Sequence, residues 1–287
     1  MKELLVISGK GGTGKTTVVA SFAAVAPSKV LADADVDAPN LHLLLDPDQL
    51  EERPYCGADL ASVDRHACTE CDRCTDLCEF EAIRNGVVDA RRCEGCGTCA
   101  LVCPADAITM IPQTTGRVYL SDTRFGPLVH AQLVAGAEAS GKLVTQVRQR
   151  ARAAAEQRHV DLILTDGSPG IGCPVIASLS GIDAALIISE PTPSGLHDLG
   201  RVLQVAAHFE VPTAVSVNKC DINFDLTRAI ERLSTALGAT TMTRIPFDRA
   251  VVDATVAATP VVEWSRGDAP KAIRALWEEV ASWDALT

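Results

Sequence analysis

The stretch Gly9-Lys10-Gly11-Gly12-Thr13-Gly14-Lys15-Thr16 fits the phosphate-binding pattern G-x-x-x-x-G-K-[ST]. The apolar run from Glu3 to Ser8 before it predicts a buried strand, and the segment from Lys15 to about Val25 predicts a helix. In this setting the glycines let backbone N–H groups approach phosphate oxygens, Lys15 reaches the β- and γ-phosphates, and Thr16 binds Mg²⁺. The alternative, a Gly-rich turn without a ligand, does not explain the flanking strand and helix. The residues expected to bind nucleotide here are Gly9, Gly11, Gly12, Thr13, Gly14, Lys15, Thr16 and Thr17.

The same rhythm of short apolar runs and helical patterns continues along most of the chain. Further strands are expected at 30–34, 161–165, 184–189, 213–217 and 241–245, and helices at 142–158, 196–208, 226–237 and 269–286. Aromatic residues make up only 4% of a chain that is 47% hydrophobic, so the core is expected to consist mainly of aliphatic side chains. The pattern predicts an α/β fold with a doubly wound, mostly parallel sheet.

The second lysine of the loop, Lys10, indicates a particular class of P-loop protein. A loop that carries it resembles the deviant Walker A loop of the MinD, ParA, Mrp and nitrogenase iron protein family of P-loop ATPases, and the resemblance covers the chain outside residues 55–112. It implies a nucleotide-dependent dimer, either a homodimer or a heterodimer with a paralogue. It also implies that Lys10 reaches the partner's nucleotide, so that Lys10 and Lys15 are expected to be catalytic.

Two acidic segments follow predicted strands where this family places its switches. The resemblance implies that Asp35, in the segment from Asp33 to Asn40, orients the attacking water and that Asp33 supports Mg²⁺. It also implies that Asp166 holds the Mg²⁺ shell and that Gly170 approaches the γ-phosphate. Carboxylates beside phosphates repel them unless a metal is present, which favours Mg²⁺ over the alternative of a solvated acidic loop.

The choice of base rests on Asn218-Lys219-Cys220-Asp221, which matches the N-K-x-D pattern of many GTPases. In that pattern the aspartate selects guanine, whereas in MinD-like proteins the equivalent asparagine contacts adenine. Lys10 and the switch segments favour ATP, with Asn218 and Lys219 at the nucleotide. Pro246, in Ile245-Pro246-Phe247-Asp248, is expected beside the base.

Eight of the eleven cysteines lie between Cys68 and Cys103, in two runs with the same C-x2-C-x2-C-x3-C spacing, 25 residues apart. This spacing is that of bacterial ferredoxins and favours two 4Fe–4S clusters over zinc. The resemblance to two-cluster ferredoxins implies that the fourth cysteine of each run binds the other cluster. One cluster is then expected on Cys68, Cys71, Cys74 and Cys103, and the other on Cys93, Cys96, Cys99 and Cys78. The first run departs from the family pattern at Glu79, where proline is usual.

These patterns predict three segments. Residues 1–54 and 113–287 are expected to form the ATPase domain around an inserted α+β ferredoxin-like domain at 55–112. The net charge of −11 argues against general binding of nucleic acid, and neither a signal peptide nor a membrane span is apparent, so a cytoplasmic protein without membrane insertion is expected. The acidic character of the last helix favours packing on the domain over membrane binding.

Two functions remain open at this point. In the first, ATP binding and hydrolysis drive dimer changes that gate electron transfer through the clusters to a redox partner. In the second, the chain is an assembly or carrier ATPase for an iron–sulfur or metal cofactor, with a client protein as its partner. Cys173 lies seven residues after Asp166, at the offset of a cluster-binding cysteine in the nitrogenase iron protein. It is either a bridging metal ligand or a plain thiol near the switch.

Overall fold

The computed structural model describes residues 1–135, 137 and 141–287, which form two compact units. The first unit comprises Met1–Glu52, Val118–Gln132 and the chain from Gly141 to the C-terminus, and the second comprises Arg53–Arg117 with the segment that begins at Leu133. We call them the nucleotide unit and the cysteine unit. Strands β3 (Asp48–Val63) and β6 (Ile108–Thr123) each begin in one unit and end in the other.

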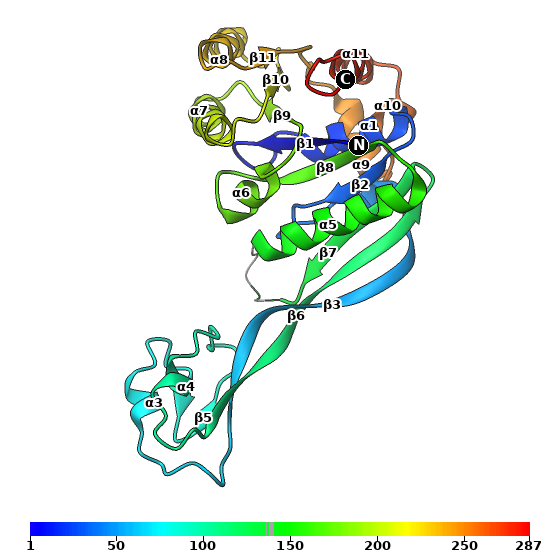
Figure 1. Ribbon diagram of the computed structural model, residues 1–287. Helices are drawn as coiled ribbons and strands as arrows, with labels where there is room; N and C mark the ends of the chain where they lie inside the picture. The colour runs from blue at the N-terminus through cyan, green and yellow to red at the C-terminus, as the bar shows by residue number, and fades with distance from the viewer. Residues whose placement is uncertain (136, 138–140) are drawn as a thin grey trace. The chain divides into compact units, whose positions relative to one another are not determined.

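The nucleotide unit is built on a sheet of nine strands in the order β11-β10-β9-β1-β8-β2-β7-β6-β3 (Figure 1). The strands not yet bounded are β1 (Lys2–Ser8), β2 (Val30–Asp33), β7 (Gly126–Leu133), β8 (Leu162–Pro169), β9 (Ala184–Ser189), β10 (Thr213–Val217) and β11 (Thr240–Thr241). Every pairing from β11 through β7 is parallel. The carboxyl ends of these strands therefore meet at one edge, where a doubly wound sheet binds its ligands.

Successive residues of a strand point to opposite sides of the sheet. Because successive residues of β1 are apolar, both faces of the sheet are covered by helices. Leu4 and Val6 of β1 belong to one core, whereas Leu5 and Ile7 belong to the other. The first core is closed by α1 (Lys15–Val25), α2 (Leu41–Leu45), α9 (Arg249–Val256), α10 (Val261–Trp264) and α11 (Asp268–Ala281). The second is closed by α6 (Cys173–Leu179), α7 (Pro193–His208) and α8 (Phe224–Ala236), and α5 (Gly141–Arg158) runs beside β2 and α6. The predicted parallel α/β fold is confirmed.

Several elements differ from the sequence-based predictions. Strands β3, β6 and β7 were not predicted. Most of β3 is exposed and most of β6 is half-buried or exposed, so neither strand has a buried face along its whole length, whereas half of the residues of β7 are buried. The predicted strand at 241–245 shortens to Thr240–Thr241, with only an isolated bridge between Asn218 and Ile245. The last helix ends at Ala281 rather than near Leu286, and its apolar face is buried, with the Trp277 ring 5.1 Å from that of Phe22. Its predicted packing on the domain is therefore confirmed.

The cysteine unit contains little regular structure. Its elements are α3 (Arg73–Asp76), the hairpin β4 (Ile83–Arg84) and β5 (Val87–Val88), α4 (Thr98–Leu101) and the ends of β3 and β6. Its buried apolar cluster consists of Ala61, Ile83 and Ile108 among the described residues, and several of the cysteines pack against it. So small an apolar core is typical of a unit that is stabilised by metal or by disulfides.

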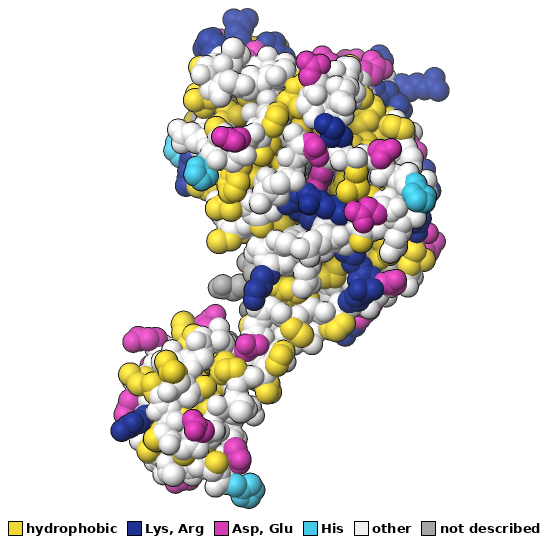
Figure 2. Space-filling model, viewed as in Figure 1, with side chains coloured by type: hydrophobic (Ala, Val, Ile, Leu, Met, Phe, Trp, Pro, Cys, Tyr) yellow, Lys and Arg dark blue, Asp and Glu magenta, His cyan; other side chains and the backbone are white. Residues whose placement is uncertain are grey.

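In the described part of the chain, no helix is both long and apolar enough to span a bilayer. Acidic and basic side chains are interspersed on the face that Figure 2 shows. On that face, neither kind of charge forms an extended surface of one sign.

Candidate nucleotide and cysteine sites

The predicted phosphate loop connects β1 to α1 at the carboxyl edge of the sheet. Gly14 takes φ +92°, a left-handed conformation that favours glycine, and a Cβ there would lie 2.3 Å from Asn218 Nδ2. Gly14 is also the N-cap of α1, and no side chain caps that helix. The free N–H groups at the start of α1 are therefore directed at the loop, as an anion site requires.

Lys15 lies at the centre of a buried charge cluster. Its Nζ is 2.8 Å from Asp166 Oδ1 and 3.2 Å from Asp35 Oδ2. Burial alone would lower the pKa of Lys15, but the carboxylates of Asp166 and Asp35 hold that pKa above its usual value. The structure thus brings the predicted phosphate-binding lysine together with both switch aspartates.

The other predicted Mg²⁺ residues lie around the same centre. Thr16 Oγ1 donates to Asp166 Oδ2 at 2.7 Å, and Asp33 accepts from the backbone N–H groups of Asp35 and Leu41, both at 3.1 Å. Burial, together with the neighbouring Asp166 charge, raises the pKa of Asp33 to about 8. Burial and the neighbouring negative charge both disfavour the ionised form of this carboxyl group.

Two further observations indicate that these residues could bind Mg²⁺ and a nucleotide. Asp33, Asp35 and Asp166 face one ammonium, and a divalent cation would neutralise the remaining charge. Thr13 Oγ1 is buried in the loop without a hydrogen-bond partner, so a bound ligand could supply the partner of this hydroxyl group. No three His, Cys, Asp or Glu side chains in the described ranges converge as ligands of a single ion. Mg²⁺ usually keeps several waters and phosphate oxygens, so it does not need such a group.

Lys10 is held by residues that the sequence analysis did not single out. Its Nζ lies 2.5 Å from Glu190 Oε1, 3.2 Å from Thr192 Oγ1 and 3.1 Å from Ser194 Oγ. The second oxygen of Glu190 is 2.9 Å from Lys219 Nζ. Burial would raise the pKa of Glu190, but hydrogen bonds from the two lysines keep it below its usual value. Glu190 could have been found from its position in the sequence, because it directly follows β9 at the edge of the sheet that bears the other site residues.

The predicted base segment is joined to the phosphate loop. Asn218 Nδ2 donates to the carbonyl of Thr13 at 2.7 Å, and Lys219 Nζ donates to the carbonyl of Gly12 at 3.1 Å. Asp221 accepts the N–H of Phe247 at 2.7 Å, next to Pro246. The remaining predicted residues lie on the same edge: Gly9 and Gly11 in the loop, Thr17 in α1 and Gly170, whose N–H donates to the Ser8 carbonyl at 2.8 Å.

The two cysteine runs adopt the same local structure. Helices α3 and α4 are 25 residues apart, as are the hydrogen bonds from the Ala82 N–H to Cys78 Sγ at 3.2 Å and from the Ala107 N–H to Cys103 Sγ at 3.3 Å. Each run also pairs with the end of the other, because the Asp64 N–H donates to the Ala107 carbonyl and the Asp89 N–H to the Ala82 carbonyl. The sequence repeat is therefore a structural repeat with exchanged partners.

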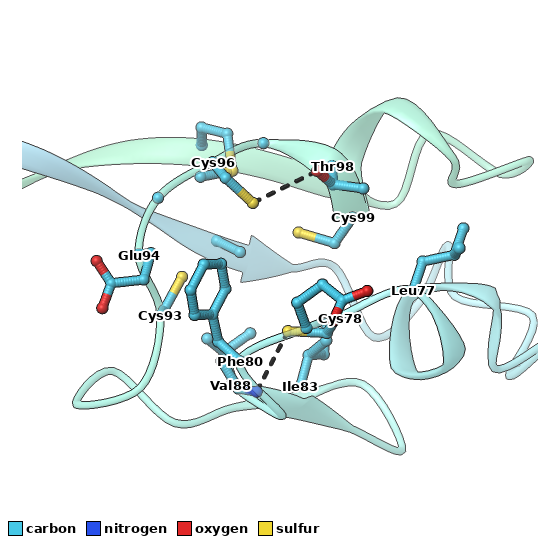
Figure 3. A pocket seen from close by; sticks show the side chains of 16 residues that line it. Leu77, Cys78, Phe80, Ile83, Val88, Cys93, Glu94, Cys96, Thr98 and Cys99 are labelled. Carbon is cyan, nitrogen blue, oxygen red and sulfur yellow. Dashed lines mark hydrogen bonds between the residues drawn. The ribbon is translucent and has the colours of Figure 1, made fainter.

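Two cavities in this unit are each lined by four cysteines. The first cavity, about 20 Å³, is lined by Cys68, Cys71, Cys74 and Cys103. The second cavity, about 210 Å³ (Figure 3), is lined by Cys78, Cys93, Cys96 and Cys99. In each, three cysteines come from one run and the fourth from the other. Cysteine thiolates are the ligands that iron–sulfur clusters take, so the chemistry of both sets fits such a group.

The three other cysteines lie apart from these cavities. Cys56 is exposed and Cys220 is buried, where burial raises the pKa of its thiol. Cys173 is exposed at the first residue of α6 and lines a cavity of about 410 Å³ with Arg148 and Arg152. Both arginines are ion-paired with Glu3. The bridging-metal interpretation of Cys173 stays a prediction.

The fold and this site define a nucleotide-binding protein of the P-loop class. A model of the family described as "CobQ/CobB/MinD/ParA nucleotide binding domain" matches residues 4–261, and the chain belongs to this family. The predicted superfamily is thereby confirmed.

The relatives found for this chain include both sequences and solved structures. An uncharacterized protein of Methanocaldococcus jannaschii, MJ0578, is 34% identical over 77% of this chain and 79% of its own length. The septum site-determining protein MinD of Pyrococcus horikoshii, complexed with Mg-ADP, has a TM-score of 0.62 at 18% identity over 98% of this chain and 96% of its own. The cell division ATPase MinD of Pyrococcus furiosus has a TM-score of 0.59 at 20% identity over 97% of this chain and 98% of its own. At these identities the two structures establish a shared fold.

Proposed function

We propose that this protein binds and hydrolyses ATP with Mg²⁺ and couples the resulting dimer changes to electron transfer through two 4Fe–4S clusters to a redox partner. The observation that carries the proposal is the pair of cavities, each with four cysteines drawn from both runs. The ferredoxin-like nature of residues 55–112 is part of the proposal. A cubane cluster binds each of its four cysteines through a different iron, so its sulfurs lie farther apart than the ligands of one ion.

The nucleotide part of the proposal rests on Lys15, Asp35 and Asp166. With ATP bound, the Lys15 ammonium would turn from the carboxylates to the β- and γ-phosphates, and Thr16 and Asp166 would hold the Mg²⁺ shell. Asp35 would then be free to accept a hydrogen bond from the attacking water. Lys10, released from Glu190, would stabilise charge on the partner's nucleotide.

The clusters supply one-electron storage when they are bound. Cys68, Cys71, Cys74 and Cys103 would hold one cluster, and Cys93, Cys96, Cys99 and Cys78 the other. The N–H groups of Ala82 and Ala107 already donate to ligand sulfurs, and such bonds stabilise the added negative charge. Complete ligation by one chain favours retention over donation, and this argues for electron transfer over the carrier function.

The test is anaerobic purification followed by two assays. We expect about eight iron atoms per chain, and reduction of methyl viologen or another one-electron acceptor at rates that differ between ATP and ADP. Transfer of iron and sulfide to an apo-ferredoxin, faster with ATP, would instead support the assembly or carrier function. Stoichiometric zinc, or iron near four, would contradict the two-cluster proposal.

A further inference from the structure

The two cavities are related by the 25-residue repeat, but their surroundings differ. The second cavity is also lined by Leu77, Glu79, Phe80 and Glu94 (Figure 3 labels all but Glu79). The positions 25 residues away are occupied by Val102, Pro104, Ala105 and Thr69. Of these four, only Thr69 lines the first cavity. We call Leu77, Glu79, Phe80 and Glu94 the Phe80 face.

Two large apolar side chains of the Phe80 face are open to solvent. Leu77 is 51% exposed and Phe80 is 45% exposed, although both line the cavity that holds four cysteines. Exposure of this kind costs solubility, and adjacent exposed apolar groups beside a site are typical of a contact surface. The smaller first cavity has no equivalent, since the large apolar side chains that line it, Val63 and Ile108, are half-buried or buried rather than exposed.

The charges of the Phe80 face are negative. Glu79 and Glu94 are both exposed, and neither makes an ion pair or a side-chain hydrogen bond within the described chain. No basic side chain lines the second cavity, whereas Arg73 lies beside Glu70 and Asp72 at the first. A partner with Lys and Arg around an apolar patch would complement this face.

We propose that the Phe80 face is the docking surface through which electrons leave the protein, and that it receives a basic redox protein. This inference rests on the proposed function. In the step, one electron passes from the group held by Cys78, Cys93, Cys96 and Cys99 to the oxidised centre of the partner, which is reduced by one electron. Glu79 and Glu94 steer and orient the partner, and Leu77 and Phe80 exclude water from the contact.

The test uses ferric cytochrome c, a basic one-electron acceptor, as the probe. The dithionite-reduced protein is mixed with it in a stopped-flow instrument at low ionic strength. Charge steering typically raises such rates by ten-fold or more, so we expect the double variant Glu79→Gln/Glu94→Gln to lose about ten-fold in second-order rate. Salt near 1 M should remove most of this difference. The matched control, Glu70→Gln/Asp72→Asn, makes the same charge change at the first cavity and should lose less than about two-fold. Equal losses in both double variants would overturn the proposal.

A second pair of variants tests the apolar contact. Phe80→Ala should lower the rate at high salt as well, whereas Leu101→Ala, at a site that is 87% exposed and outside the second cavity, should not. Equal rates for these two variants would overturn the proposed role of the apolar side chains in the contact. Iron is counted in every sample. Wild-type protein without iron would contradict the proposed function itself, whereas full iron with no difference between the paired variants contradicts only the docking surface.

Discussion

The nucleotide unit and the cysteine unit differ in the size of their buried apolar cores. In the nucleotide unit, alternate residues of β1 enter two large apolar cores, and helices close both. Among the residues that the structure describes in the cysteine unit, the buried apolar cluster consists of Ala61, Ile83 and Ile108. Hydrophobic burial scales with apolar area, so the first unit has a source of stability that the second lacks.

The two units also differ in the contacts that their functional side chains make. In the nucleotide unit, the buried Lys15 is ion-paired with Asp35 and Asp166. The cysteines of the other unit instead form part of its packing, since five of them contact its small core. We infer that the nucleotide unit folds first and then binds its ligand, whereas folding of the cysteine unit is coupled to metal binding.

Iron removal should give the largest difference between the two units. We expect chelation under anaerobic conditions to abolish hydrogen-exchange protection throughout residues 53–117, because the proposed clusters would be the main source of stability of the cysteine unit. Protection of β1, β8 and β9 should persist. Cys56→Ser serves as the control, since Cys56 lines neither cysteine cavity, and it should retain iron and protection. Full protection of residues 53–117 without iron would contradict metal-coupled folding.

Lys15→Ala should produce the next largest effect, confined to the nucleotide unit. It removes the cation for the phosphates and leaves Asp35 and Asp166 without their ion-pair partner. We expect loss of ATP binding by calorimetry and a decrease of about 3 kcal/mol in the free energy of unfolding. Lys142→Ala, at an exposed residue of α5, is the matched control. Iron content should not change, and a loss of iron in Lys15→Ala would show that the two units are not independent.

Lys10→Ala separates binding from hydrolysis. Lys10 contacts Glu190, Thr192 and Ser194 rather than the Asp35–Asp166 centre, so ATP binding should remain. Hydrolysis should fall by about 100-fold or more if the lysine stabilises charge on the partner's nucleotide, as charged groups supplied in trans do. Turnover and ATP-dependent dimerisation are measured by phosphate release and light scattering. Normal turnover would disprove the role across the dimer, and Lys271→Ala at an exposed site is the control.

The smallest effect concerns a ring stack that the sequence analysis left without a role. His130 stacks on His42 and Tyr119, and burial, with a further contribution from His42, lowers the pKa of His130 to about 4. An unfolded histidine takes up its proton near pH 6.5, so between about pH 6.5 and 4 only the unfolded chain is protonated there. Stability is therefore lost as pH falls.

His130→Phe keeps a ring in the stack and removes the titrating group. We expect the decrease in Tm between pH 7 and pH 5 to be smaller in this variant by roughly 5 °C. His208→Phe, at an exposed position of the same unit, is the control. An unchanged pH dependence in His130→Phe would show that the buried imidazole does not limit acid stability.

Features whose residues lie close together in the chain could be predicted from the amino-acid sequence. The loop from Gly9 to Thr16, the buried strands around it and the two cysteine runs all have fixed local spacing, and local spacing follows from backbone geometry. Strands β3 and β6 could not be predicted in the same way, because neither has a buried face that continues along the whole strand.

Contacts between residues that are distant in the chain depend on how the chain packs. Parallel strands place their carboxyl ends at one edge of the sheet, so Glu190 comes to bridge Lys10 and Lys219, 180 and 29 residues away in the chain. No sequence pattern contains that contact. The asymmetry of the two cysteine cavities is likewise tertiary, since the repeat predicts equal sites and the differing residues around them, Phe80 above all, make one site open and apolar. Local chemistry follows from spacing, whereas the pairing of charges and the exposure of surfaces follow from how the chain packs.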